Sequence, residues 1–185
     1  IACAVPAVRV GDTAKNAEDI CAYIEKADAR QADIVLFPEL ALTGYSCQDL
    51  FFQDTLWTGV QQGIRKIADC TKDHPGVTAA VGLPVRTGMR LYNCAAIISR
   101  GKIHALVPKT YIPNYNEFYE KRWFSSGAEV TEDLAELLGE PVPVLPRAVF
   151  RVGGALLGVE ICEDMWTPMP PSTFLALNGA EVILN

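Results

Sequence analysis

Three ionisable residues each follow an apolar run that ends abruptly, and their chemistry is complementary. Glu39 comes after ADIVLFP, Lys109 after HALVP and Cys162 after LLGVEI. A thiolate is a nucleophile, a carboxylate can carry protons, and an ammonium group can stabilise a thiolate or a developing oxyanion. If these runs are strands of an α/β fold, their carboxyl ends can bring the three residues together. The sequence therefore raises the hypothesis of covalent catalysis by a cysteine.

Each of these residues also has an ordinary structural explanation. A cysteine after an apolar strand is more often a small core residue, and Lys109 could be a solvated loop lysine. Glu39 could be a carboxylate exposed in a turn after Pro38. Neither histidine of the chain supports a Cys-His pair at these strand ends. The spacing alone leaves the hypothesis open.

The composition argues against several other classes of protein. The chain has 185 residues, 50% of them hydrophobic, and a net charge of −6, which suits one domain with a sizeable core. It has no basic stripe for nucleic acid or anionic membranes, no apolar run as long as a membrane span, and no signal-peptide pattern. Six cysteines without a CxxC pair, with two histidines, argue against a metal site. Reduced thiols in a cytoplasmic protein are the simplest interpretation, and Cys3, Cys21, Cys70 and Cys94 are interpreted as packing residues.

The elements that must position these residues alternate between strands and helices. Helices are predicted from Ala14 to Ala27, with Asp12 or Thr13 as N-cap, from about residue 56 to the His74-Pro75-Gly76 breaker, and over 172–179. Strands are predicted at 1–8, 33–37, 77–85, 91–99, 102–108, 148–152, 155–161 and 181–185. Arg100-Gly101 and Gly153-Gly154 indicate hairpins. Residues 108–127 show no period, and 139–147 are too rich in proline to be regular.

Crossover and hairpin connections together predict an α/β layered fold with mixed sheets. The two early helices must cover a sheet face, and hairpin strands that are apolar on both faces suggest two sheets packed together beneath outer helices. One domain is expected over residues 1–185. Because the chain begins without methionine and stops inside EVILN, we expect that domain to be incomplete at its C-terminal end.

Several sequence blocks resemble those of a known family. FPELALTGY, PKTY and GVEICED are similar to the three signature blocks of the nitrilase (carbon–nitrogen hydrolase) superfamily. GYSCQDLF, LYNCA, PKTYIPNYNEFYEKRWF and GVEICEDMWTPMPPS resemble the glutaminase domains of glutamine-dependent NAD synthetases over essentially the whole chain. The block that follows Pro108 is the most specific of these matches.

The resemblance implies an αββα sandwich and a Glu-Lys-Cys triad. Glu39 matches the general base, Lys109 the catalytic lysine and Cys162 the nucleophile, whose thiolate the lysine should favour. The substrate-binding residues implied are Tyr115, Glu117 as a carboxylate that helps hold the lysine and substrate, Tyr45 in the pocket wall, and Glu163, whose backbone N–H faces the oxyanion. Gln48 stands where these domains often have glycine.

The implied reaction is hydrolysis of the side-chain amide of L-glutamine through a thioester. The ammonia would serve a separate synthetase domain of the same polypeptide, which amidates deamido-NAD. No metal or organic cofactor is expected for the glutaminase half-reaction. ATP and Mg are expected only in the synthetase domain, whose SGGxDS motif this sequence lacks. A cytoplasmic homo-oligomer is also implied.

Three other interpretations stay open at this point. The first is a stand-alone nitrilase-type amidase acting on another small amide, which should lack the PNYNEFYEKRWF block. The second is a non-catalytic nitrilase-fold association domain, which loss of a triad residue would favour. The third is a structural α/β domain with an incidental cysteine.

Overall fold

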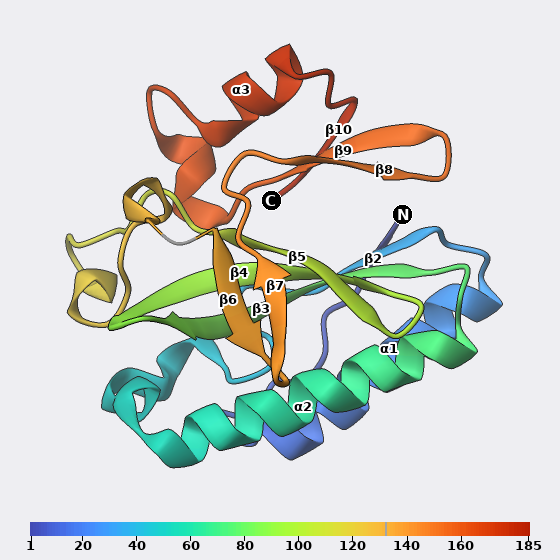
Figure 1. Cartoon of the computed structure of the whole chain (residues 1–185), viewed down its shortest axis with the longest axis horizontal. Helices are drawn as coiled ribbons and strands as arrows, with labels where there is room; N and C mark the ends of the chain where they lie inside the picture. Colours follow the sequence, from blue (N-terminus) through green and yellow to red (C-terminus); the bar gives the residue numbers. More distant parts are fainter. Residues whose placement is uncertain (132) are drawn as a thin grey trace.

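The computed structural model describes residues 1–131 and 133–185, arranged in layers (Figure 1). Helices α1 (Thr13–Ala29) and α2 (Asp54–Asp73) cover one face of a five-stranded sheet. A three-stranded sheet lies against the other face of that sheet, and helix α3 (Pro171–Leu177) lies outside it. The predicted αββα sandwich is confirmed. Among the described residues, no helix combines the length and apolar character needed to cross a membrane.

The five-stranded sheet has the order β1-β2-β3-β4-β5. Its strands are β1 (Ala2–Cys3), β2 (Ile34–Leu36), β3 (Thr78–Thr87), β4 (Arg90–Ser99) and β5 (Lys102–Pro108). The first three strands pair in parallel, whereas β3 with β4 and β4 with β5 pair antiparallel. Two reversals restore the direction, so β5 runs the same way as β2 and both end at the same edge.

The three-stranded sheet has the order β10-β9-β8, formed by β10 (Val182–Leu184), β9 (Ala155–Val159) and β8 (Val149–Val152). Strands β8 and β9 form the predicted antiparallel hairpin around Gly153-Gly154. Strand β10 returns through α3 to pair in parallel with β9. Both sheets are therefore mixed, as the combination of hairpins and crossovers predicts.

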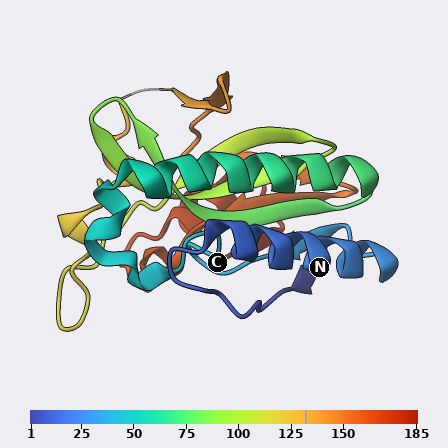
Figure 2. The ribbon, with the colours of Figure 1, turned by 90° about the horizontal axis from the view of Figure 1, so that it is seen from below.

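Two apolar layers hold the sandwich together. The α1 and α2 faces predicted from their periodicity pack on the five-stranded sheet, and Figure 2 shows the two helices side by side. Asp12 caps α1 by accepting a hydrogen bond from the Lys15 amide. A second cluster fills the space between the sheets and comprises Ile34, Ala80, Ala95, Ile97, Val107, Leu157, Val159, Ile161 and Leu184.

Two predictions about strands are wrong. The proline-rich range 139–147 contains β7 (Glu140–Pro143), which pairs antiparallel with β6 (Leu134–Leu137). Pro141 and Pro143 lie two residues apart, so their nitrogens face the same side of the strand and both can point away from β6. The predicted strand over 1–8 is reduced to Ala2–Cys3, because Pro6 has no amide hydrogen with which to extend a ladder.

Candidate active site

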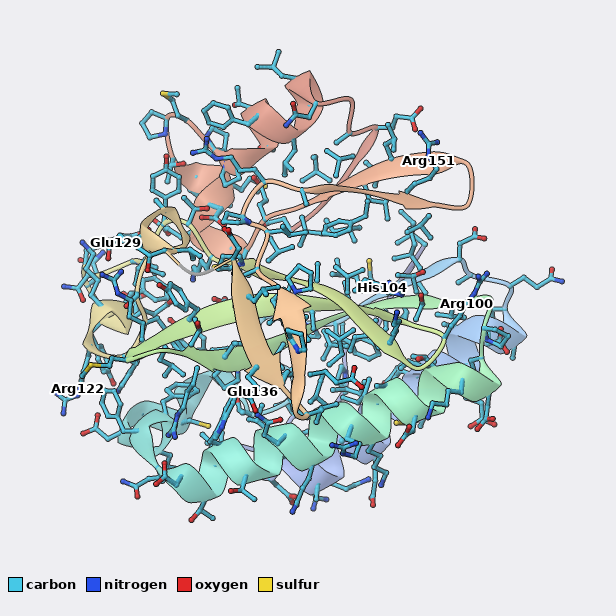
Figure 3. All side chains as sticks on the ribbon, in the orientation of Figure 1. Arg100, His104, Arg122, Glu129, Glu136 and Arg151 are labelled. Atoms are coloured by element: carbon cyan, nitrogen blue, oxygen red, sulfur yellow. The ribbon has the colours of Figure 1, made fainter. Side chains whose placement is uncertain are left out.

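Strands β2, β5 and β9 deliver the three predicted catalytic residues to one end of the sandwich. Figure 3 shows Arg100, in the turn before β5, and Arg151, beside the turn before β9, at the opposite end of the two sheets. Both strands run from that end toward the site. Glu39 and Lys109 therefore come from the five-stranded sheet, whereas Cys162 comes from the three-stranded sheet.

The turn that carries Glu39 is pressed against β3. The amide nitrogen of Leu42 donates a 3.1 Å hydrogen bond to the carbonyl of Gly82. A β-carbon added at Gly82 would lie 2.3 Å from the Leu40 nitrogen and 2.5 Å from the Pro38 oxygen. Only glycine leaves room for the turn at this point of β3, so this residue fixes the height of Glu39 above the sheet.

Two donors hold the Glu39 carboxylate. Its Oε1 atom accepts a 2.7 Å hydrogen bond from Lys109 Nζ and a 2.6 Å hydrogen bond from Asn93 Nδ2. Asn93 lies on β4 and is fully buried. Sequence reasoning missed Asn93, although an amide side chain inside the otherwise apolar run LYNCAAII is the signal that could have found it, since buried polar groups need partners.

Lys109 is completely buried and uses all three of its N–H donors. One is directed to Glu39 Oε1, and the other two are directed to Glu120 Oε1 at 2.9 Å and Oε2 at 3.0 Å. Burial lowers the pKa of the Lys109 ammonium, but the two carboxylates outweigh it and the pKa is raised above its usual value. The lysine therefore stays charged between two acids, and it is not a solvated loop residue.

The second carboxylate on Lys109 is that of Glu120, so the prediction that Glu117 holds the lysine is wrong. Glu117 is exposed, whereas Glu120 is 1% exposed. The loop after Tyr111 folds back, because the Glu120 amide donates to the carbonyl of Pro113 at 3.1 Å, and this turns Glu120 inward. Burial raises the pKa of the Glu120 carboxyl, and Lys109 opposes that shift.

Tyr45 belongs to the same hydrogen-bonded group. Its hydroxyl donates a 2.7 Å hydrogen bond to Glu120 Oε1. Burial and the contact with Glu120 raise the pKa of the Tyr45 hydroxyl, so it remains a donor at neutral pH. Tyr45 therefore orients the carboxylate behind Lys109, which is a more specific position than the pocket wall that the resemblance implied.

Cys162 begins a short 3-10 helix, η4 (Cys162–Trp166), with a positive φ of 47°. Asp164, which is 1% exposed, fixes this turn by accepting from the amides of Ile161 at 3.0 Å, Thr110 at 3.1 Å and Tyr111 at 2.7 Å. One carboxylate thus joins the turn of the cysteine to the segment that follows Lys109. The sequence alone assigned Asp164 no role.

The Cys162 thiol is protonated at neutral pH in the free site. Burial raises its pKa to about 11, the charge of Glu39 and a hydrogen bond to Glu39 add to this effect, and Lys109 only partly opposes it. Lys109 does favour the thiolate, as expected, but burial and Glu39 outweigh its effect, so the thiol keeps its proton. The contact with Glu39 instead places a base beside the proton that must be removed.

Sequence comparison decides the family. A family model described as carbon-nitrogen hydrolase matches residues 1–185. This chain belongs to the carbon–nitrogen hydrolase family. The glutamine-dependent NAD(+) synthetase of Mycobacterium leprae is 37% identical to this hydrolase over 178 residues, which are 95% of this chain and 26% of that protein. The enzyme of the same name from Xylella fastidiosa is 38% identical over 176 residues, 95% of this chain and 29% of its own length. The chain thus spans under a third of these relatives.

Solved structures resemble this hydrolase in fold. A glutamine-dependent NAD(+) synthetase from Cytophaga hutchinsonii matches with a TM-score of 0.79 and 27% identity over 99% of this chain and 29% of that one. An amidase of the nitrilase superfamily from Nesterenkonia sp. AN1 matches with a TM-score of 0.74 and 20% identity over 98% of this chain and 62% of its own. The amidase supports the fold alone.

Two of the remaining predicted substrate residues of this hydrolase, Tyr115 and Glu163, lie together, and Glu163 adjoins the nucleophile in sequence. The Tyr115 hydroxyl donates to both carboxylate oxygens of Glu163, at 2.9 and 2.8 Å. Tyr115 is 50% exposed, and Glu163 is the residue after Cys162. The structure thus places a partly exposed carboxylate, that of the residue directly after the nucleophile, and its tyrosine partner in a surface pocket, and Glu117 remains exposed on the same loop as Tyr115.

A cavity of about 390 Å³ between the two sheets opens onto the thiol. Its polar lining includes Glu39, Glu160, Cys162 and Asn185, and apolar residues, Phe37 among them, form much of its wall. A largely apolar, concave site with a few convergent polar groups is typical of a pocket for a small molecule. In this carbon–nitrogen hydrolase the thiol of Cys162 and the carboxylate of Glu39 therefore line the same pocket.

Proposed function

We propose that this domain hydrolyses the side-chain amide of L-glutamine through a thioester on Cys162. The observation that carries the proposal is the 2.7 Å ion pair of Glu39 with the buried Lys109, together with the Cys162 thiol, which lines the same cavity as Glu39 and whose pKa that carboxylate raises. A base, a buried cation and a nucleophile in contact are the groups that acyl transfer requires.

In the first step Glu39 accepts the proton of the Cys162 thiol as the sulfur attacks the amide carbon. The charge that develops on the amide oxygen is stabilised by Lys109 and by the backbone N–H of Glu163. Support for the second donor comes from η4, which begins at Cys162, since the first amides of a helix have no partner within the helix. All three Lys109 donors are engaged in the free site, so the oxyanion would replace one bond to Glu120.

In the second step Glu39 gives its proton to the departing nitrogen, and ammonia leaves. The thioester carbonyl is then attacked by water, whose proton Glu39 accepts. Collapse of this second tetrahedral species breaks the carbon–sulfur bond, returns the proton to Cys162 and releases glutamate. One carboxylate thus acts as base, as acid, as base again and finally as the acid that returns the proton to the sulfur, and the ion pair with Lys109 holds it in one position throughout.

The selectivity for glutamine would come from Glu163 and Tyr115. The carboxylate of Glu163, the residue after the nucleophile, can pair with the α-ammonium group of an amino acid, and Tyr115 keeps that carboxylate oriented. A neutral small amide would gain nothing from this contact. The arrangement therefore favours glutamine over the substrates of a stand-alone amidase.

We propose that the ammonia released serves a synthetase domain of the same polypeptide, in which ATP and Mg would act, and that the glutaminase half-reaction uses neither metal nor organic cofactor. The names of the Mycobacterium leprae and Xylella fastidiosa relatives support this wider role. A cytoplasmic homo-oligomer is part of the same proposal.

The test is a comparison of Cys162→Ala with Cys70→Ala in the intact protein. Cys162→Ala should abolish glutamate release and glutamine-dependent NAD synthesis, while synthesis from added ammonia stays near the wild-type rate. Cys70, on the outer helix α2, serves as the control thiol and should change neither rate. An equal loss of the ammonia-dependent reaction in a folded Cys162→Ala protein would refute the assigned role.

A further inference from the structure

Helices α1 and α2 run side by side in the same direction on the outside of the molecule (Figure 2). At one end of the pair, Thr13 of α1 meets Gly59 of α2, and at the other end Asp28 lies 2.9 Å from His74. Each helix carries one cysteine: Cys21 lies in the middle of α1, and Cys70 lies in the last turn of α2. Neither thiol takes part in the hydrolytic chemistry described above.

The two thiols lie in the seam between the helices. Cys70 Sγ is 3.9 Å from the carbonyl oxygen of Cys21, and Cys21 Sγ is 3.9 Å from the carbonyl oxygen of Lys66, one helical turn before Cys70. Each sulfur therefore rests on the backbone of the opposite helix. The two thiols also influence each other's titration, since Cys70 raises the pKa of Cys21 and Cys21 lowers the pKa of Cys70.

We propose that Cys21 and Cys70 form a dithiol modification site, which small-molecule disulfides oxidise to an intramolecular disulfide that joins α1 to α2. Both thiols are partly exposed, so a small oxidant can reach them. The other four thiols are either buried or lie outside this helix pair. Cys47 and Cys94 are buried, and Cys3 and Cys162 belong to the opposite, strand side of the molecule.

The chemistry balances with the oxidant alone. One protein thiol loses its proton and attacks the small disulfide, which forms a mixed disulfide and expels one small thiolate. The second protein thiol loses its proton and attacks the protein sulfur of that mixed disulfide, which forms the Cys21–Cys70 bond and expels the second small thiolate. The protein dithiol loses two electrons, and the two protons pass to the two small thiols released.

The surroundings of the pair make this reaction slow at neutral pH. Burial raises the pKa of Cys21 to about 12, with Cys70 adding to the shift and Lys66 opposing it. Burial also raises the pKa of Cys70, with Asp73 and Glu25 adding to it. Because the thiolate is the attacking form, oxidation should accelerate steadily as the pH rises from 7 to 9.

The experiment treats the intact protein with oxidised glutathione at pH 8.5, blocks the remaining thiols, and digests the protein without reduction. Mass spectrometry should find the peptides of Cys21 and Cys70 joined, with a mass two hydrogen atoms below their sum. The species should run as a single chain on a non-reducing gel. The bond closes a loop of 49 residues. The oxidised protein should therefore melt on the order of 5–10 °C higher than the reduced one.

Cys21→Ser and Cys70→Ser are the test variants, and Cys47→Ser is the matched control. The first two should lose both the joined peptide and the rise in melting temperature, whereas the control should keep both. Glutathione attached singly to Cys21 and Cys70, or no reaction at either thiol while Cys3 is modified, would overturn the proposal. Glutaminase activity enters none of these measurements, so the outcome is independent of the proposed function.

Discussion

The Nζ atom of Lys109 lies 2.9 Å from Oε1 of Glu120, and both side chains are buried almost completely. A buried cation that serves two carboxylates leaves the site with one net negative charge when the thiol is protonated. Removing either carboxylate would leave Lys109 with too few acceptors in a place that water hardly reaches. The function of the lysine therefore depends on Glu120 as well as on Glu39.

Glu120→Gln should impair turnover far more than Glu117→Gln. The substitution removes a negative charge that raises the pKa of Lys109. It also puts an amide group, which has one acceptor oxygen in place of two, next to the donors of Lys109 and Tyr45. We expect a loss of roughly tenfold or more in glutamate release, because a displaced Lys109 would stabilise the oxyanion less well. Glu117→Gln is the matched control on the same loop. Steady-state kinetics would compare the two variants, and equal rates of glutamate release would contradict the assignment of Glu120 as the partner of Lys109.

Glu39→Gln should make Cys162 more reactive while abolishing turnover. The negative charge of Glu39 and its hydrogen bond both raise the pKa of the thiol, so their removal should lower that pKa from about 11 toward 9. The rate of alkylation by iodoacetamide at pH 9 should rise, and glutamate release should fall to background because the base is lost. Alkylation slower than in the wild-type protein would show that Glu39 instead favours the thiolate form of Cys162.

Lys109→Met should reduce glutamate release by about a hundredfold to a thousandfold, the usual result of losing one oxyanion donor. Lys109→Arg should rescue little, because a planar guanidinium cannot occupy the space of a compact ammonium between Glu39 and Glu120. Circular dichroism would confirm folding of both variants. Near wild-type turnover in a folded Lys109→Met protein would remove the lysine from the mechanism.

Gly82→Ala should displace the turn of Glu39, since its new β-carbon would meet the backbone at 2.3 Å. We expect a loss of about 1–3 kcal/mol in the free energy of unfolding and a larger fall in kcat than in substrate affinity. Gly154→Ala is the matched control, because nothing lies within 4 Å of a β-carbon there. Urea unfolding together with kinetics measures both effects, and equal behaviour of the two variants would argue against the close contact.

The positions of the three catalytic residues could be predicted because apolar strands and the residues that end them are local features of the sequence. Glu39, Lys109 and Cys162 follow β2, β5 and β9 as expected. The choice between Glu117 and Glu120 could not be made in this way. It depends on the path of an aperiodic loop, which is set by the hydrogen bond from the Glu120 amide to Pro113.

The protonation state of Cys162 also could not be predicted from the sequence. A lysine and a glutamate near a thiol have opposite effects, and the sequence contains neither the distances nor the burial that decide between them. Asn93 and Asp164 are similar cases, because their importance lies in partners that are distant in sequence. Asn93 meets Glu39 within the five-stranded sheet, and Asp164 meets the amides after Lys109 across the two sheets.

The base and the nucleophile stand on different sheets, so the thickness of the apolar layer between the sheets sets the distance from Glu39 to Cys162. Ala80 and Val107 contribute to that layer from one sheet, and Val159 contributes from the other. A methyl group added or removed there would change the separation of two reacting groups that it never touches, and a displacement of about 1 Å can cost a hundredfold in rate. Variants with harmful substitutions in this core would then fold and express normally, and only their turnover would be reduced.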